Sequence, residues 1–331
     1  SCAASTMVRL RSQRVLIPSD RDSWWCTGVN FDGACPLHVT EIALAADLDT
    51  LHHLALFAGA GASSCTTSCV FGSERASPVY ASAAGGSAWR LPPHVGLRVG
   101  ASSAVPALHL QAHHRPSHEP MLDSSGVNLQ VTSAMRPNDA VFLTAGAVFG
   151  FAIPPAQRRF RLRFANRAVF HAPIRIFSIF SHTHGDGVAS TAWLLRQGTV
   201  LEQIGRSKHT GINGYQLLDA EMEMLPGDEL RVQCELDTRE RRECVQGGGR
   251  ADDEMCGRIL GVYPAQHLGS SETVNVSANE RVDPRRPHTS PLTVDALIVL
   301  ASCTGAHGGG TLGSRSRVGG GRTWRERHRC T

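Results

Sequence analysis

Two histidines lie two residues apart behind an apolar run in the segment SIFSHTHGDGVAS, residues 178–190. In a β-strand, residues i and i+2 project from the same face, so His182 and His184 can share one metal ion. The GDG turn that follows would place the pair at the end of a strand. Two surface histidines would leave the same pattern, so it allows a structural as well as a metal-binding interpretation.

A third ligand for this pair must come from elsewhere in the chain. Met255 stands out because it directly precedes Cys256, and a disulfide there would restrain a long, flexible side chain. Its alternative role is that of a core residue that fills a gap. A thioether is a soft ligand that cuprous copper accepts and zinc rarely takes, so two histidines and a methionine predict copper. The other sulfur candidates in the second half of the chain are Met135, Met222 and Met224.

Two further histidine pairs stand upstream, His52-His53 in DTLHHLALF and His113-His114 in LHLQAHH. Adjacent residues point to opposite faces of a regular strand, so both can bind one metal only where the strand bends or different ring nitrogens are used. One member of the second pair is therefore a candidate bystander. A site with three imidazoles would suit copper in either oxidation state.

Short apolar or alternating runs, separated by Gly, Pro, Asn and Asp, predict the elements that position these residues. Many short strands at regular spacing predict an all-β protein, with two antiparallel β-sandwich domains of the jelly-roll kind in tandem. Residues 41–59 also allow a helix, although two strands suit them at least as well. The predicted strands include HVGLRVG, ALHLQAHH, GVNLQVT, AVFLTAG, RFRLRF, IRIFSIF, ELRVQCEL, RILGVY and DALIVLAS.

The chain has 331 residues, which favours two domains. A segment rich in Pro, Ser and charge at 113–126 separates two groups of strands, which predicts domains at 1–120 and 121–304. Residues 305–331 are rich in Gly and Arg and poor in apolar residues, so this tail is expected to be disordered.

Composition excludes several classes of protein. The net charge is only +4 and basic residues are scattered outside the tail, so nucleic acid is not an expected partner. No apolar run approaches 18 residues, so no membrane span is expected. Ten cysteines fit no zinc pattern and predict disulfides in a secreted protein or in the lumen of the secretory pathway, with a reduced cytosolic set as the alternative. A monomer is expected.

The order and spacing of several motifs resemble those of the copper type II, ascorbate-dependent monooxygenases. This family includes peptidylglycine alpha-hydroxylating monooxygenase and dopamine beta-monooxygenase. The resemblance covers residues 22–304; LHHLALF and VGLRVG look closer to the peptidylglycine branch, and DSSG to the dopamine branch. The motifs are DTLHHLALF, VGLRVG followed by LQAHH, DSSG, IPP, HTHGDG, GGGRADDEMC and LASCT.

The resemblance implies two β-sandwich domains, each with one copper ion, facing each other across a solvent cleft. It implies that His52, His53 and His113 hold the electron-transfer copper, and that His114 lies outside the ligand set. It implies that His182, His184 and Met255 hold the catalytic copper, with ascorbate as reductant and O2 as co-substrate. The implied reaction is hydroxylation of the alpha-carbon of a C-terminal glycine, as in peptide amidation, with an amine or another small molecule as the alternative substrate. The implied disulfides are Cys234 with Cys256 and Cys26 with Cys65.

Two departures from the family concern the substrate. Phe180 stands where the peptidylglycine enzymes carry an Arg that binds the substrate carboxylate, and Ile259 replaces the Tyr that assists it. Losing that anchor costs about 2–4 kcal/mol for a buried charge-assisted pair. Arg175 and Arg258 are the nearest candidates to replace it. Ser124 also replaces one family cysteine, which leaves Cys303 without its expected partner.

Two other functions remain open. His182, His184 and Asp186 fill the first three places of the HxHxDH motif of metallo-β-lactamase-type hydrolases, but Gly187 takes the fourth and that fold needs α/β layers. The chain could also be a secreted, catalytically inactive module that binds copper or another partner.

Overall fold

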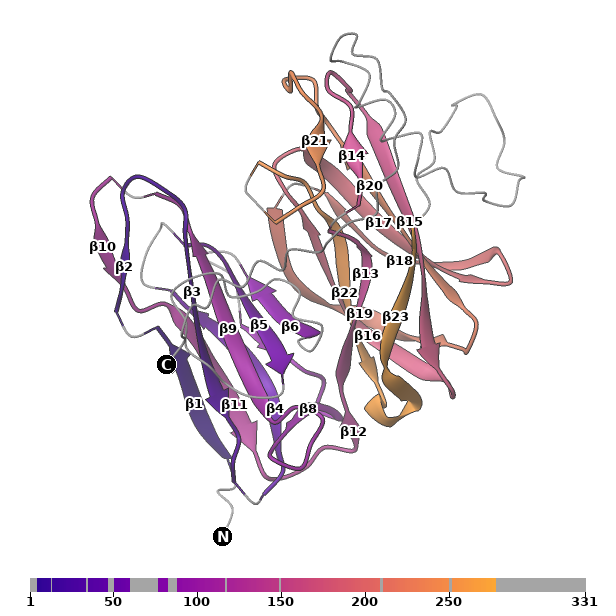
Figure 1. Cartoon of the computed structure of the whole chain (residues 1–331). Helices are drawn as coiled ribbons and strands as arrows, with labels where there is room; N and C mark the ends of the chain where they lie inside the picture. The colour runs from indigo at the N-terminus through magenta and orange to yellow at the C-terminus, as the bar shows by residue number, and fades with distance from the viewer. Residues whose placement is uncertain are drawn as a thin grey trace, which may run out of the picture.

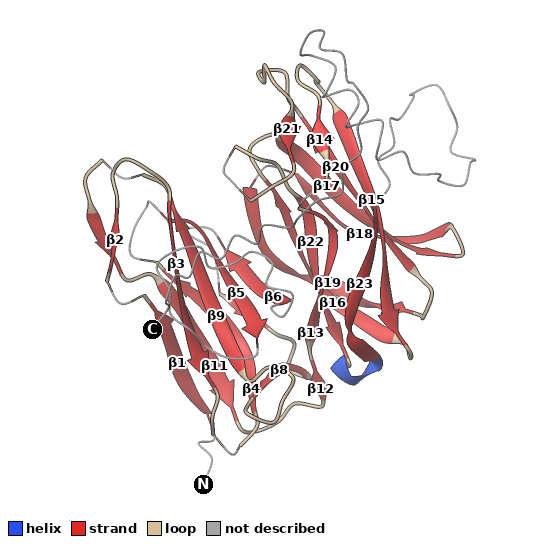
Figure 2. Cartoon of the chain, viewed as in Figure 1, coloured by secondary structure: helices blue, strands red, loops and turns tan. Residues whose placement is uncertain are grey.

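A computed structural model describes residues 5–12, 14–33, 35–46, 51–59, 77–82, 88–116, 118–148, 150–208, 211–249 and 252–277, and Figure 2 shows them as strands with one short 3-10 helix. The all-β prediction is confirmed. None of the helical segments within these ranges has the length and apolar character needed to cross a membrane. The predicted strand DALIVLAS and the predicted tail lie outside the described residues.

Side chains along the strands are either alternately or continuously buried, as the sequence patterns predict. GVNLQVT, ALHLQAHH and ELRVQCEL each form a strand with the predicted bounds. The helix that residues 41–59 allowed does not form. That segment holds the end of one strand and the whole of the next, and apolar side chains on both faces of the second strand are buried. The elements are β1 (Ser5–Arg11), β2 (Val15–Ile17), β3 (Ser23–Asn30), β4 (Leu37–Ala45), β5 (Leu51–Gly59), β6 (Ser77–Ser82), β7 (Trp89–Arg90), β8 (Val95–Val99), β9 (Ala107–His114), β10 (Met121–Asp123), β11 (Gly126–Thr132), β12 (Asn138–Asp139), β13 (Val141–Ala147), β14 (Ala152–Ile153), β15 (Phe160–Phe170), β16 (Ile174–Thr183), β17 (Gly187–Arg196), β18 (Thr199–Lys208), β19 (Gly211–Met224), β20 (Glu229–Leu236), β21 (Val245–Gln246), β22 (Cys256–Tyr263), η1 (Ala265–His267) and β23 (Leu268–Ser277).

Strands β1 to β12, called here the first half, form one sandwich. One sheet has the order β1-β11-β4-β8-β12 with β7 beside β4, the other has the order β3-β9-β5-β6, and β10 pairs with β2. Inward residues of both sheets, such as Ile42 and Leu129 on one and Leu54 and Leu110 on the other, belong to one buried apolar cluster. The strands β10 and β11, which follow the predicted boundary at residue 120, pair with strands of this half. The predicted domain limits stay a prediction.

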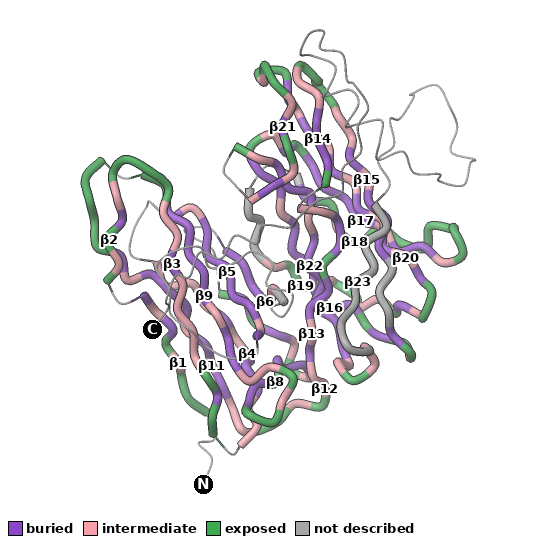
Figure 3. Tube along the Cα trace, in the orientation of Figure 1, coloured by how far each residue is buried: buried purple, intermediate pink, exposed green. Residues whose placement is uncertain are grey.

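Strands β13 to β23, called the second half, form another sandwich beside the first (Figure 1). Its sheets have the orders β13-β22-β16-β19 and β18-β17-β20-β15-β23. A second apolar cluster lies between them and includes Ile176 and Leu260 from one sheet and Phe164 and Val232 from the other. Figure 3 shows the corresponding buried stretches along the inner strands of both halves.

The two halves meet through aromatic rings. The ring of Trp89 in β7 lies 4.3 Å from that of Tyr215, 5.4 Å from that of Phe142 and 6.4 Å from that of Phe177, all centroid distances to residues of the second half. Tyr80 of β6 stacks on Tyr215 at 5.8 Å. The apolar cluster of the first half therefore continues into residues of the second.

A single residue, Ala140, connects β12 to β13, and the segment before it is fixed to the first half. His38 is buried, with its Nε2 2.8 Å from Asp139 Oδ1, while its Nδ1 accepts the backbone N–H of Arg136 at 2.9 Å. The amide of Ala140 donates to the carbonyl of Gly96 at 2.8 Å. This bonding requires the neutral form of His38.

The pH dependence of stability tests this connection. Burial lowers the pKa of His38, against the raising effect of Asp139, so the folded state binds fewer protons than the unfolded state below pH 6.5. Its contribution to stability is complete above pH 6.5 and decreases as the pH falls from there toward the lowered folded pKa. We expect the unfolding midpoint to fall less between pH 7.5 and pH 5 in His38→Gln than in the wild type. His118→Gln, a change at an exposed histidine, is the control and should keep the wild-type slope; equal slopes in all three proteins would contradict the prediction.

Candidate metal centres

Three imidazoles of the first half converge on one point. His52 and His53 lie in β5 and His113 in β9, and the Nδ1 of His52 lies 3.1 Å from that of His53 and 3.2 Å from that of His113. The pairing of β5 with β9 shifts register between Leu51 and His53, and this irregularity lets adjacent histidines face the same side. One nitrogen of each ring lies within 4.8 Å of the others. Nitrogen lone pairs that approach so closely need a shared proton or cation, so the group fits a metal ion.

The protonation of these rings suits a metal ligand. Burial lowers the pKa of His52 to about 4 and that of His53 well below its usual value, and charges on neighbouring histidines would lower both further. Burial also lowers the pKa of His113, although Asp22 opposes this shift. The three rings are neutral at pH 7, which is the form that binds a metal.

Two residues that the sequence did not single out support His113. Trp24 stacks on its ring with the centroids 3.8 Å apart and the planes 6° from parallel. The carboxylate of Asp22 lies 3.4 Å from Nε2, which favours a proton on that nitrogen and leaves the lone pair of Nδ1 for the cluster. The segment RDSWWC contains Asp22 and Trp24, but nothing in the sequence places them beside His113. The pairing of β3 with β9, which sets Trp24 opposite His113, does so.

His114 projects away from the three converging rings. The Nε1 of Trp25 donates to its Nε2 at 3.1 Å, and the carboxylate of Asp123 lies 3.2 Å from the same nitrogen. His114 and Asp123 have no exposed side-chain surface. His114 thus belongs to a buried polar group that includes the first residue of the DSSG motif.

The second histidine pair lies at the end of β16. The rings of His182 and His184 have their centroids 4.9 Å apart, and the amide of Gly187 donates to the carbonyl of His184 to close the predicted turn. The Nδ1 of His184 lies 2.8 Å from the carbonyl oxygen of Asp253. A proton on Nδ1 donated to that carbonyl leaves the lone pair of this ring on Nε2, which is the arrangement of a metal-binding histidine.

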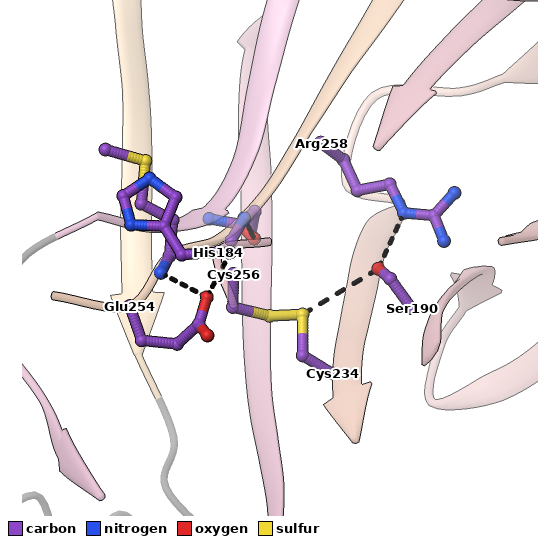
Figure 4. The surroundings of a disulfide bond; sticks show 9 residues. His184, Ser190, Cys234, Glu254, Cys256 and Arg258 are labelled. Carbon is purple, nitrogen blue, oxygen red and sulfur yellow. Dashed lines mark hydrogen bonds between the residues drawn. A yellow bond between two sulfur atoms is a disulfide. The ribbon is translucent and has the colours of Figure 1, made fainter. Parts of the chain in front are cut away.

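Glu254 organises this site, and the sequence analysis missed it. Its buried carboxylate accepts the backbone N–H groups of His184, Asp186 and Met255, so it fixes the backbone of two candidate ligands at once. Figure 4 shows the carboxylate of Glu254 beside His184. Burial raises its pKa to about 7 in spite of these three donors. The acidic run DDE before Met255 could have pointed to Glu254, since a carboxylate next to a candidate ligand can orient that ligand.

Replacing Glu254 should therefore weaken the second site alone. In Glu254→Ala, the N–H groups of His184, Asp186 and Met255 lose their acceptor, at a cost of about 1–3 kcal/mol for each one that stays buried. We expect the affinity of the second site for copper to fall roughly 10- to 100-fold, which is typical when a residue that orients a metal ligand is removed. The affinity of Glu254→Gln should lie between those of the wild type and Glu254→Ala. Equilibrium dialysis against copper measures this. Asp252→Asn, at an exposed carboxylate nearby, is the control; equal affinities in Glu254→Ala and the control would contradict the prediction.

The disulfide predicted between Cys234 and Cys256 is confirmed. It joins β20 of one sheet to β22 of the other, and Cys256 directly follows Met255. Cys26, Cys35 and Cys244 are also disulfide-bonded, and no cysteine is free in the described part of the chain. The predicted partner of Cys26, Cys65, lies outside the described residues, as does Cys303.

The other candidate methionines lie elsewhere. Met135 is 39% exposed, Met224 is fully buried in the apolar cluster of the second half, and Met222 packs against that cluster. Met255 is buried, and its backbone shares an acceptor with that of His184. Among the four, Met255 is the methionine that the structure brings beside the histidine pair.

Phe180 and Ile259 form a cross-strand pair between β16 and β22 and are both buried. Neither candidate arginine joins them. Arg258 projects from the opposite face of β22 into the sandwich, and Arg175 lies at the other end of β16, with Nη2 4.0 Å from Glu223. Both positions that would bind a carboxylate in the peptidylglycine enzymes are therefore filled by buried apolar side chains.

The two histidine groups lie close to each other. The rings of His53 and His182 have their centroids 6.3 Å apart in a T-shaped contact. This differs from the solvent cleft that the resemblance implied. The physical reason is the aromatic contact between the halves, in which β6 packs against β19 and β7 packs against β13.

The hydrolase alternative is not supported. Asp186 would have to turn toward a second metal, but its two carboxylate oxygens share the Nε–H of Arg241, at 3.0 and 3.1 Å. The described residues also form sheets on sheets rather than the α/β layers of that fold.

Comparison with known proteins shows which family the second half of the chain resembles. Residues 138–278 match the family model described as "Copper type II ascorbate-dependent monooxygenase, C-terminal domain". This range contains His182, His184 and Met255. The second half of the chain is thus similar to the C-terminal domain of the copper type II ascorbate-dependent monooxygenases.

Its relatives come from both branches of that family. The chain is 28% identical to dopamine beta-hydroxylase of Rattus norvegicus over 78% of this chain and 46% of the relative. It is 30% identical to DBH-like monooxygenase protein 1 of Homo sapiens over 57% and 33%, and 28% identical to peptidyl-glycine alpha-amidating monooxygenase of Mus musculus over 77% and 27%. The chain spans about half or less of the length of these relatives.

Proposed function

We propose that this chain is a copper- and ascorbate-dependent monooxygenase that hydroxylates a C–H bond with O2 and binds two copper ions. His52, His53 and His113 would hold the electron-transfer copper, and His182, His184 and Met255 the catalytic copper. The observation that carries the proposal is the convergence of three neutral imidazoles in a chain whose second half is similar to the C-terminal domain of this family.

Copper at these positions would supply two separate one-electron centres, which O2-dependent hydroxylation requires in a protein without flavin or haem. The chain's own residues prepare both sites. Asp22 and the carbonyl of Asp253 hold the histidine tautomers, Glu254 aligns the backbones of His184 and Met255, and Trp24 fixes the ring of His113. A soft thioether in the second site favours the cuprous state there.

Metal content and O2 uptake test the activity. The reconstituted chain should bind two copper ions and consume O2 only when ascorbate and a substrate are present. Copper binding without O2 uptake would favour the alternative of an inactive copper-binding module, and zinc at full occupancy with no copper uptake would contradict the metal assignment itself. The disulfides support a secreted protein or one in the lumen of the secretory pathway, and a monomer is the simplest state.

For the substrate, Phe180 and Ile259 support an aromatic or alkyl group held by apolar contact, as in an amine or another small molecule. A peptide with a C-terminal glycine, which the motifs of the first half favoured, is the second candidate; it would need another group to hold its carboxylate. We expect turnover of a phenethylamine to exceed that of a dansylated peptide ending in glycine when both are offered with ascorbate and O2.

The variant Phe180→Arg sharpens this assay, because it returns a guanidinium to the position where the family carries one. It should shift the preference toward the peptide, while Phe180→Leu, the matched apolar control, should not. Faster turnover of the peptide by the wild type would reverse the ranking and leave the monooxygenase proposal intact.

A further inference from the structure

Arg258 is a charged side chain in the interior of the second half. It is 1% exposed, and its guanidinium lies between the two sheets, where its Nε donates to Oγ of Ser190 at 3.1 Å (Figure 4). A Cβ at Gly205 of β18 would lie 3.6 Å from Nη1, so glycine at this position leaves room beside the guanidinium. Burial lowers the pKa of Arg258 to about 10, which still leaves it charged at pH 7.

No carboxylate neutralises this charge in the part of the chain that the structure describes. Among the residues of the second half whose burial is described, two acidic ones are buried and both are engaged elsewhere: Glu254 accepts three backbone N–H groups, and Asp228 forms a two-bond pair with Arg196. An uncompensated buried charge is strongly unfavourable, so a folded protein with this arrangement needs a counter-charge.

Two buried hydrogen-bond donors also lack a good acceptor at this point. Nη2 of Arg258 is buried with no acceptor in the described structure. The hydroxyl of Ser190 accepts from Nε of Arg258, and its other contact is Sγ of Cys234 at 3.7 Å, a disulfide sulfur and thus a weak acceptor. The buried Ser207 lies opposite Ser190 on β18 and faces the same side of the sheet. A guanidinium and a hydroxyl that both have a hydrogen to donate are the groups that bind an anion.

We propose that Arg258 and Ser190 bind a small monovalent anion of the halide class, with chloride as the natural ligand. The size limit follows from burial, because a larger oxyanion would have to displace the packed side chains between the sheets. A water molecule could accept from the same donors but would leave the charge of Arg258 uncompensated. The anion would tie β22 to β17 and β18, on the far side of β22 from Ile259. This site is independent of the proposed function.

Thermal unfolding of the full chain in sodium chloride or bromide, against sodium gluconate at equal ionic strength, tests the proposal. We expect a saturable rise in the unfolding midpoint of about 2–3 °C when the halide reaches ten times its dissociation constant. Arg258→Met, which has a long neutral side chain, should lose the difference between halide and gluconate. Arg175→Met, a change at a half-exposed arginine of the neighbouring strand, should keep it.

Crystals of the wild-type chain grown in bromide give a second measurement that does not depend on the folding of a variant. An anomalous peak within hydrogen-bond distance of Nη2 is the expected result. A water molecule at that position without anomalous signal, or equal stabilisation by halide and gluconate in the wild type, would overturn the proposal. A halide response that persists in Arg258→Met would overturn it as well.

Discussion

His113→Ala is expected to bind one copper ion, against the two that we propose for the wild type, and to lose turnover. One ring nitrogen of each of His52, His53 and His113 lies within 4.8 Å of the others, so removing one leaves two ligands for an ion that needs three from this site. The loss of affinity should exceed the roughly 10- to 100-fold that is typical of losing an outer partner of a ligand. Metal analysis after dialysis and ascorbate-dependent O2 uptake measure the two effects.

The reciprocal variant makes this result specific. His182→Ala should lose the other copper ion and keep the first, so that each single variant binds one. His109→Ala, four residues before His113 in the same strand, is the control and should bind two. Two copper ions in His113→Ala, or the loss of both, would contradict independent sites with these ligands.

Trp89→Ala is expected to lower the free energy of unfolding by about 3–5 kcal/mol, the usual cost of removing a buried aromatic side chain. Trp89 is 4% exposed and contacts Phe142, Phe177 and Tyr215 across the junction, so the cavity would lie between the two halves. We also expect turnover to fall, because the contact between His53 and His182 depends on this packing. Urea unfolding gives the stability and O2 uptake gives the turnover.

Two other variants separate packing from chemistry. Trp89→Phe keeps most of the ring and removes an indole N–H that is buried without an acceptor in the described structure, so its cost should be much smaller. Trp193→Ala, at a partly exposed tryptophan of β17, should cost less than Trp89→Ala. A small loss in Trp89→Ala would mean that the junction contributes little to stability.

The sequence predicted the strands well because their signals are local. Alternation in ELRVQCEL and the apolar run before His182 depend on residues next to each other in the chain, and both strands form as predicted. The predicted pairing of Cys234 with Cys256 came from the resemblance and is confirmed.

The parts that were missed depend on distant pairing. Asp22 approaches His113 only because β3 pairs with β9, and Glu254 reaches His184 across 70 positions of sequence. The contact of Trp89 with Tyr215 joins two sandwiches, and no periodicity within either one encodes it. Arg258 was a candidate to hold a substrate carboxylate, but the pairing of β22 with β16 buries it on the face opposite Ile259.

The shared apolar cluster also has a consequence for synthesis of the protein. Trp89 and Tyr80 are covered partly by Phe177 and Tyr215, which leave the ribosome later, and the cluster is completed by Tyr263. At about 5–20 residues per second, the interval between Trp89 and Tyr263 is on the order of 10–35 s. During that time the first half presents a bare aromatic face, which is the kind of surface that chaperones bind and that leads to aggregation when they are absent.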